Sequence, residues 1–249
     1  MSIPERGEYS GVAGFVLRIY PFGERSQIVD LFTATLGRVR AAAHCSSKNT
    51  SPLKAVLQPF VPLLLGLKEG RSDLMNLRSA AVSGRPFRLP LPGYFCASYM
   101  NELLFYLYRA REPAPQLFAS CLKLLEALSG GAQDIRAEPP LRAFETALLE
   151  ALGCSINYCL QDGRRLQPGL AYRLSPEDGF VPCFPEDPLG TAGGNCFDGG
   201  TLIELARGES RTPAAAAALK RLNRILLDRL LSGRELQSRR MYLEFVKNR

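Results

Sequence analysis

Residues 37–67 read GRVRAAAHCSSKNTSPLKAVLQPFVPLLLGL, and this stretch decides the fold. It opens with the period of two that is typical of a strand, with Arg38 and Arg40 on one face and apolar residues on the other. A polar loop with Lys48 and Lys54 follows. The chain then returns as an apolar run interrupted by prolines, as expected of a strand that starts late or lies at an edge. The stretch therefore predicts part of a small barrel with one cationic face, which suits a phosphate backbone.

Five short strands are expected near the start of the chain, at residues 12–20, 28–32, from Gly37 onward, 60–67 and 74–82. One long loop separates the third strand from the fourth. This pattern fits a five-stranded OB-fold barrel, and closing the barrel disposes of exposed strand edges. Phe15 and Phe32 are expected to fill its interior.

After a proline-rich connector, the spacing of apolar residues changes to that of helices. Five helices are expected, at residues 95–109, 115–128, 139–152, 213–231 and 238–246. Prolines in first turns and glycines after last turns support several of these boundaries. Together the five helices predict a compact bundle.

The segment between the third and fourth helices has a weaker pattern. Residues 171–174 and 179–182 are expected to form a hairpin, and residues 185–200 to form a loop. The expected class is α+β. An OB-fold barrel domain spans residues 1–84, and a helical domain spans residues 85–249 with a small irregular β/loop insertion at about 154–200.

Positive charge is concentrated at the two ends of the chain, whose formal net charge is +7. Residues 1–80 hold ten Lys/Arg and six Asp/Glu, residues 81–200 hold ten and thirteen, and residues 201–249 hold eleven and five. Basic ends around an acidic middle favour a polyanion that both ends grip. Ordinary solvated charge is the alternative.

The sequence shows neither a membrane span, which needs roughly 20 apolar residues, nor an export signal in its polar first ten residues. Its seven cysteines are therefore expected to be reduced thiols in a cytoplasmic protein. Cys154, Cys159, Cys183 and Cys196 share one segment, but gaps of five and thirteen residues do not match the paired ligands of a zinc ribbon. No bound metal is expected.

Catalytic motifs are missing from the sequence. The single histidine, His44, lies in the basic region, where a surface role is expected rather than that of a general base. The sequence contains no phosphate-cradling glycine loop, no His-Glu-x-x-His and no Gly-x-Ser-x-Gly. The residues therefore favour a binding protein over an enzyme.

Two groups of cations are expected to contact nucleic acid. The barrel group consists of Arg18, Arg38, Arg40, Lys48, Lys54 and Lys68. The second group lies toward the C-terminus and includes Arg221, Arg224 and Arg239. Aromatic residues near the barrel group, Tyr20, Phe22 and Phe60, are candidates to stack on bases. For the second group, a solvated helix end is the alternative.

Five motifs occur in an order that is typical of one known family: Gly37-Arg-Val-Arg40, Leu57-Gln58-Pro59-Phe60, Leu77-Arg78-Ser79-Ala80, Asn101-Glu102-Leu103-Leu104 and Leu141-Arg142-x-Phe144-Glu145. Through them the chain resembles the bacterial recombination mediator RecO, from about residue 12 to its end. The family has an N-terminal OB-fold and a C-terminal helical domain, which agrees with the expectation from periodicity.

The resemblance implies a function. RecO proteins bind single- and double-stranded DNA and anneal complementary strands. With the partner RecR they help to load RecA recombinase during gap repair, without a nucleotide cofactor, so the expected location is the cytoplasm, in association with the nucleoid. A protein-only adaptor whose barrel is a scaffold, or an RNA-binding OB protein, are the alternatives.

The resemblance also implies contact with the acidic, hydrophobic C-terminal tail of the single-stranded-DNA-binding protein SSB. A receptor for such a tail needs an apolar pocket with an arginine at its rim. The expected residues are Lys123, Leu141, Arg142, Phe144 and Leu148. Pairing of Arg142 with Glu138 or Glu145 on the helix surface is the alternative.

One departure from the family concerns metal. Many relatives carry two Cys-x-x-Cys pairs as a zinc site after the third helix. Here Cys159 is followed by Asp162 where a second cysteine would stand, and Cys183 has no partner three residues on. The chain therefore resembles the branch that lacks the zinc site.

Overall fold

The computed structural model describes residues 7–23, 26–44, 52–70, 73–129, 138–175, 179–184 and 195–248. The chain forms two compact units. The first comprises Met1–Ala151 together with Arg234–Arg249, and the second comprises Leu152–Gly233. The C-terminal helix therefore belongs to the same unit as the N-terminal barrel.

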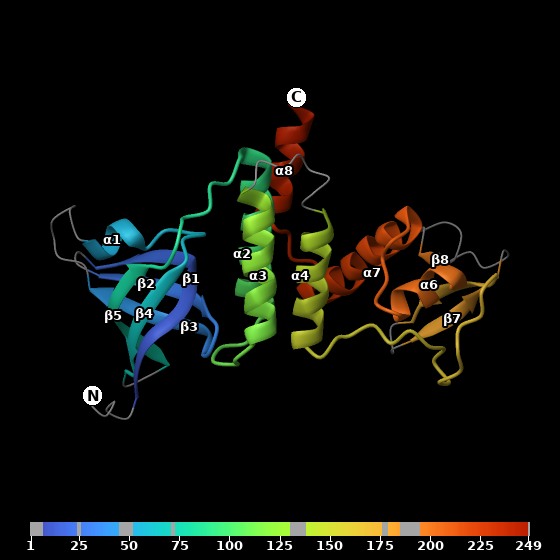
Figure 1. Ribbon diagram of the computed structural model, residues 1–249, viewed down its shortest axis with the longest axis horizontal. Helices are drawn as coiled ribbons and strands as arrows, with labels where there is room; N and C mark the ends of the chain where they lie inside the picture. Colours follow the sequence, from blue (N-terminus) through green and yellow to red (C-terminus); the bar gives the residue numbers. More distant parts are fainter. Residues whose placement is uncertain are drawn as a thin grey trace. The chain divides into compact units, whose positions relative to one another are not determined.

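Five strands of the first unit close into a barrel (Figure 1). They are β1 (Glu8–Phe22), β2 (Ser26–Thr33), β3 (Gly37–His44), β4 (Leu63–Lys68) and β5 (Leu74–Val82). Their order around the barrel is β1-β2-β3-β5-β4, and β1 pairs with both β2 and β4. The β3–β5 pair is parallel, and the four others are antiparallel. The predicted OB-fold barrel is confirmed.

Aliphatic side chains fill the barrel interior. On β3, Val39, Ala41 and Ala43 belong to this core, whereas Arg38 and Arg40 lie on the outer face. The period of two therefore holds where the sequence predicted it. A short helix that the sequence did not predict, α1 (Pro52–Val56), leads from the β3 side toward β4 and packs apolar residues against the same core. β4 starts only after Pro62, as the prolines indicated.

Gly37 explains how β3 begins. Its φ is +63°, a left-handed conformation that side chains rarely adopt. A Cβ at this position would lie 2.0 Å from the carbonyl oxygen of Glu112, so the backbone of the helical region passes directly over it. Only glycine fits both conditions. The start of β3 is thereby held against the segment that follows α2.

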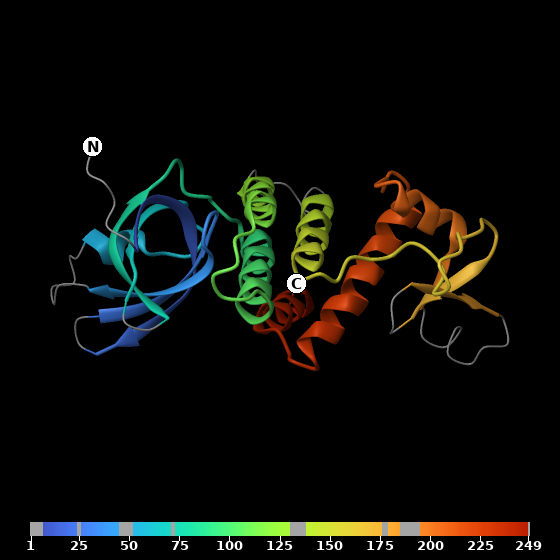
Figure 2. The same ribbon diagram turned by 90° about the horizontal axis from the view of Figure 1, so that it is seen from below.

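Besides α1, the helices in the described part of the first unit are α2 (Leu91–Leu107), α3 (Pro115–Ser129), α4 (Glu138–Ala151) and α8 (Gln237–Lys247). α3 packs against α2 and α4, and α8 packs against α2 (Figures 1 and 2). α2 is apolar nearly all round, and it is buried between its neighbours as its composition predicts.

Phe15 and Phe32 join the barrel to these helices, which corrects one expectation. Both are buried, but they lie on the outer face of the barrel instead of filling it. The ring of Phe118 on α3 is 5.7 Å from that of Phe15 and 6.0 Å from that of Phe32. Tyr108, just after α2, meets Phe32 edge-on at 5.5 Å. Burial was predictable from residue type, but the partner across the interface was not.

The described residues of the second unit form a small antiparallel sheet and the helices α6 (Gly199–Ala206) and α7 (Pro213–Leu231). The sheet has the order β7-β6-β8, with β6 (Ala171–Leu174), β7 (Phe180–Cys183) and β8 (Cys196–Asp198). The helices α6 and α7 pack on one another (Figure 2). The predicted hairpin 171–174/179–182 is confirmed.

Two details of this region differ from the prediction. β8 and the start of α6 lie within residues 185–200, which the sequence analysis assigned to a loop. α7 was expected in one bundle with the other helices, but its apolar face, with Ala215, Ala218 and Leu222, joins the core of the second unit. Periodicity shows that a helix has an apolar face, but it does not show which core that face joins.

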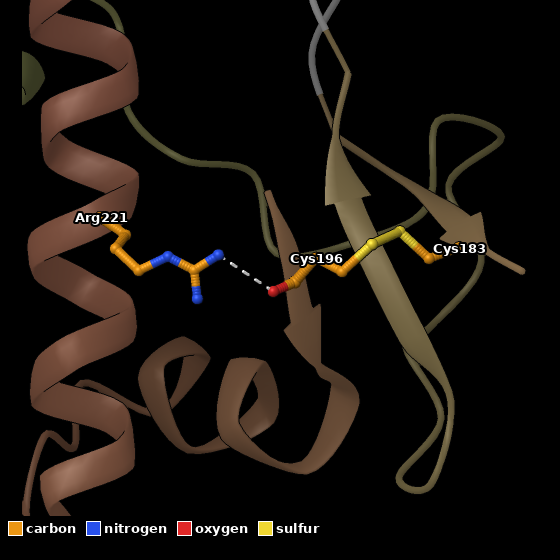
Figure 3. The surroundings of a disulfide bond; sticks show 3 residues. All are labelled: Cys183, Cys196 and Arg221. Atoms are coloured by element: carbon orange, nitrogen blue, oxygen red, sulfur yellow. Dashed lines mark hydrogen bonds between the residues drawn. A yellow bond between two sulfur atoms is a disulfide. The ribbon is translucent and has the colours of Figure 1, made fainter. Parts of the chain in front are cut away.

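A disulfide joins Cys183 at the end of β7 to Cys196 at the start of β8 (Figure 3). The expectation of reduced thiols is therefore wrong for these two residues. Because a disulfide sulfur is not a thiolate ligand, the four cysteines of this segment do not fit a zinc site with four thiolate ligands. Within the described ranges no three His, Cys, Asp or Glu side chains gather closely enough to hold a metal ion. The absence of zinc stays a prediction.

Candidate nucleic-acid interface

The outer side of β1, β2 and β3 carries several of the residues expected to bind nucleic acid. Strand register places the outward side chains in three rows: Arg18/Asp30/Arg40, Tyr20/Ile28/Ala42 and Phe22/Ser26/His44. We call these nine residues the outer face. The first row lies next to the helices, and the last row lies at the end of the barrel, where Phe22 is 55% exposed. Arginine and exposed aromatic side chains thus share one surface, as in single-strand-binding grooves.

Arg40 forms a bidentate ion pair with Asp30 in the first row. Its Nε lies 3.1 Å from Oδ1 and its Nη2 lies 3.3 Å from Oδ2. Asp30 is buried, whereas half of the Arg40 side chain is exposed. The hydrogen bond from Arg40 to Asp30 raises the pKa of the guanidinium, against an opposing effect of burial. The pair therefore holds Arg40 in one orientation while leaving part of it accessible to a phosphate.

Arg18 and Arg38 both contact Phe105 on α2 and are partly exposed. The guanidinium carbon of Arg18 lies 4.7 Å from the ring centre of Phe105 on α2, and that of Arg38 lies 5.5 Å from the same ring. Arg38 also donates a hydrogen bond to the Phe105 carbonyl oxygen. The two arginines therefore fasten α2 to the barrel through cation–π contacts, a structural role that the sequence analysis did not foresee.

The remaining barrel cations do not join this surface. Lys68 on β4 pairs with Glu8 of β1 at 2.7 Å, and hydrogen bonding to Lys68 is the main cause that lowers the pKa of the Glu8 carboxyl. Lys54 is exposed on α1. Lys48 lies outside the described residues. The structure therefore brings together Arg18, Arg38 and Arg40, and it places Lys54 and Lys68 on other elements.

The C-terminal group of cations is divided between the two units. Arg221 and Arg224 lie on α7, in the second unit, whereas Arg239 lies on α8, in the first. Arg221 donates to the carbonyl oxygen of Cys196 at 3.2 Å (Figure 3). Its guanidinium also covers the ring of Phe197. Arg224 pairs with Asp228 at 3.5 Å. Sequence proximity in this region does not correspond to membership of one folded unit.

Arg239 belongs to a network between α8, α2 and α4. It donates to the hydroxyl of Tyr99 at 3.2 Å and lies over the Tyr99 ring. The same hydroxyl donates to Glu145 at 2.9 Å, and Glu145 accepts from Arg142 at 2.8 Å. Burial, followed by the negative charge of Glu145, raises the pKa of Tyr99. The network is therefore a polar cluster within the helical core.

The residues expected at the SSB-tail receptor are mostly part of this core. Phe144 and Leu148 are fully buried, so they do not line an open pocket, and Leu141 is half-buried. Arg142 pairs with Glu145 and, at 3.7 Å, with Glu138, which is the alternative that the sequence left open. Lys123 on α3 is exposed.

The Asn101-Glu102 motif holds three elements together, which the sequence analysis missed. Asn101 Nδ2 donates to the carbonyl oxygens of Val16 and Leu17 on β1, at 3.1 and 3.4 Å. Glu102 accepts hydrogen bonds from the start of α8. Polar residues in the middle of an apolar helix were the available signal, because buried polar groups need partners.

A groove lies beside this motif, between β1, α2 and α8, with a cavity volume of about 230 Å³. Its lining includes Arg18 and the aromatic residues Phe60, Tyr94, Phe105 and Tyr106. Sequence reasoning considered Arg18 and Phe60 only as parts of the barrel. Their approach to the ends of α2 and α8 depends on how the barrel docks on the helices.

These features define a class of protein: an OB-fold barrel docked on a helical layer, with arginine and aromatic side chains on the outer face of the barrel. Comparisons with known proteins agree with this class. A family model described as "Recombination protein O N terminal" matches residues 10–85, and one described as "Recombination protein O C terminal" matches residues 90–239. The chain belongs to the RecO family of DNA repair proteins.

Curated relatives support the same conclusion. The chain is 36% identical to DNA repair protein RecO of Aliivibrio fischeri (strain MJ11) over 233 residues, which cover 92% of this chain and 93% of the relative. It is 37% identical to the Salmonella dublin protein of the same name over 94% of each chain. It is 34% identical to that of Marinobacter nauticus over 95% of each. No helix in the described parts of the chain combines the length and apolar character needed to cross a membrane.

Proposed function

We propose that this chain is a DNA-binding recombination mediator. It anneals complementary single strands, binds the C-terminal tail of SSB, and works with RecR to load RecA in recombinational gap repair. Such work would place it in the cytoplasm, in association with the nucleoid. The observation that carries the proposal is family membership across both the barrel and the helical region.

The outer face is the proposed DNA-binding surface. Arg40 supplies a cation that Asp30 orients, and Tyr20 and Phe22 supply rings for stacking. Binding that relies on backbone charge and stacking is tolerant of sequence, as annealing of arbitrary complementary strands requires. Lys54 on α1 is proposed to add a contact to the phosphates. Lys48, which precedes α1 in the sequence and lies outside the described residues, is proposed to add another.

The proposed SSB contact has two candidate cations. Lys123 is exposed and available for the acidic residues of a tail. Arg142 already pairs with Glu138 and Glu145, so one of these ion pairs would have to break before Arg142 could bind a tail carboxylate. We therefore favour Lys123 as the first contact and treat Arg142 as a candidate that depends on local opening of α4.

A strand-annealing assay tests the proposal. Two complementary oligonucleotides are mixed with the protein, first bare and then coated with SSB or with SSB lacking its tail. Annealing of bare strands is expected, and annealing of coated strands is expected only when the SSB tail is present. Failure to anneal bare DNA would contradict the mediator function, and equal annealing with tailless SSB would contradict the tail contact. Matched RNA strands test the RNA-binding alternative.

A further inference from the structure

The groove between β1, α2 and α8 is continuous with the outer face, because Arg18 belongs to both. Two of its residues, Tyr94 and Met241, are 43% and 39% exposed. The cavity of about 230 Å³ is smaller than the roughly 300–1,000 Å³ of sites for drug-sized molecules. It therefore suits one planar ring system better than a whole nucleotide or a helix of another protein.

Aromatic side chains form much of the groove wall. Tyr94 meets Phe60 edge-on at 5.5 Å, and Phe105 meets Tyr106 edge-on at 5.0 Å. Phe60 has a φ of +63°, a conformation that is uncommon for any residue with a side chain and a real outlier for a bulky one. Such outliers persist where the surrounding structure holds them, often at ligand sites. Here the conformation places an aromatic ring in the wall where glycine would have fitted the backbone more easily.

The charge around the groove is positive. Arg18 lines it, and the guanidinium of Arg234 lies 4.5 Å from the ring centre of Tyr106. Glu102 is the acidic residue of the lining, but both of its oxygens accept hydrogen bonds from the N-terminus of α8. The groove therefore favours a ligand that combines a flat ring with negative charge.

Asn101 fixes the floor of the groove. It is buried, and its Nδ2 donates to the carbonyl oxygens of Val16 and Leu17 on β1. The aromatic walls above it therefore stand on a part of α2 that is bonded directly to the barrel.

We propose that this groove holds one unstacked base of single-stranded DNA, with the neighbouring phosphates bound by Arg18 and Arg234. The strand would cross the outer face at Arg40 and insert a base between Tyr94 and the Phe105–Tyr106 pair. A base held there is unpaired, so the site would favour single strands over duplex DNA. This inference rests on the proposed DNA binding and deepens it by naming the part of the ligand that is recognised.

The test separates base recognition from phosphate binding. Affinities are measured for an oligothymidylate and for an abasic oligonucleotide of equal length and charge, using the full chain. Wild type is expected to prefer the intact strand by at least about fivefold, the low end for one stacked base. Tyr94→Ala and Tyr106→Ala should each reduce this preference severalfold, and the part that remains is stacking on Tyr20 and Phe22 of the outer face. Both variants should leave the affinity for the abasic strand and the salt dependence unchanged. Phe184→Ala, at an exposed aromatic of the second unit, is the matched control.

A second readout locates the base directly. An oligonucleotide with 5-iododeoxyuridine is photocrosslinked to the protein, and the linked peptides are mapped. Crosslinks to Tyr94, Phe105 or Tyr106 are expected. Crosslinks confined to the outer face, or an intact-to-abasic ratio that neither tyrosine variant changes, overturn the base site while leaving DNA binding by the barrel intact.

Two other outcomes also overturn the inference. If wild type binds neither oligonucleotide, the proposed function fails together with the base site. If Tyr94→Ala leaves DNA binding unchanged but weakens binding of an acidic peptide that ends in an apolar residue, the groove belongs to a protein partner.

Discussion

The carboxylate of Glu102 on α2 caps the N-terminus of α8 at Ser238. Its Oε2 accepts from the Ser238 backbone N–H at 2.9 Å and from the Ser238 hydroxyl, while Oε1 accepts from the Gln237 N–H at 3.1 Å. Leu236, the residue at the N-cap position of α8, has no side-chain oxygen that could do this. A negative charge also complements the helix dipole there. The C-terminal helix is thus held by a residue 135 positions earlier in the chain.

Replacing Glu102 should loosen α8. Glu102→Ala removes charge-assisted hydrogen bonds to otherwise unpaired N–H groups, which should cost about 1.5–3 kcal/mol. Hydrogen exchange of the α8 amides should accelerate, while that of the barrel core should change little. Glu244→Ala, which removes an exposed partner of Arg240 at 4.0 Å, is the control and should have almost no effect. Unchanged exchange in α8 would show that the cap is not what holds this helix.

The salt dependence of DNA binding should show whether the cations of the outer face and of α1 contact phosphates. Arg40→Ala and Lys54→Ala are each expected to reduce the slope of log Kobs against log salt for single-stranded DNA by about 0.7, with similar loss for all sequences. Lys48→Ala tests the remaining cation of this set. Arg164→Ala is the control, because Arg164 is 77% exposed in the second unit and pairs with Asp162. A slope that stays constant in the Arg40/Lys48/Lys54 triple variant would remove these residues from the DNA interface.

Arg142 should matter more for stability than for tail binding. Glu145 is 2% exposed, so Arg142→Ala leaves a buried carboxylate without its ion-pair partner, at a cost of about 3–5 kcal/mol. Denaturant unfolding measures this loss. Glu138→Gln, at the more exposed partner, should cost less than about 1 kcal/mol.

Binding of an SSB tail peptide then tests whether Lys123 or Arg142 is the main contact for the tail. Lys123→Ala should weaken binding of the peptide without changing the stability of the protein or its affinity for DNA. If folded Arg142→Ala also loses the peptide while Lys123→Ala retains it, the receptor is centred on Arg142, as the sequence first suggested.

The disulfide should stabilise the second unit. Cys183 and Cys196 are 13 residues apart, and closing a loop of about that size stabilises by about 3 kcal/mol in the chain-entropy model. A thiol reductant, or Cys183→Ser, should therefore lower the unfolding temperature of this unit. In Cys183→Ser the reductant should have no further effect. Alkylation followed by mass spectrometry reports the state of the two cysteines, and full alkylation of the native protein without reductant would contradict the bond. Elemental analysis of the same preparation should find no stoichiometric zinc.

Alkaline pH should also weaken the second unit. Burial raises the pKa of Tyr158, whose ring stacks against Phe180, to about 12. An unfolded tyrosine has a pKa of about 10. The neutral phenol therefore contributes stability below pH 10, and this contribution is lost as pH rises from about 10 through about 12. Tyr158→Phe should flatten the dependence of stability on pH in that window, and an unchanged curve would exclude Tyr158 as its source.

Local chemistry was enough to predict most of the elements. The period of two in β3 and the glycine at its start predicted a strand with arginines outward, and the late start of β4 was readable from its prolines. Proline and glycine at helix ends gave the bounds of α3, α4 and α7 to within a few residues. These features depend on neighbours within one or two turns of the chain, so the amino-acid sequence alone determined them. Family membership likewise followed from short motifs.

Tertiary structure alone decided what the charged and aromatic residues contact. The sequence predicted that Arg18 and Arg38 bind phosphate, but it did not predict that docking of α2 places Phe105 beside both side chains. Periodicity states which face of a helix is apolar, but it does not state which of two cores covers that face, and α7 therefore joined the second unit. Contacts between residues far apart in the chain depend on how whole elements pack. The cap from Glu102 to Ser238 and the groove lined by Arg18, Tyr94 and Met241 exist only after that packing.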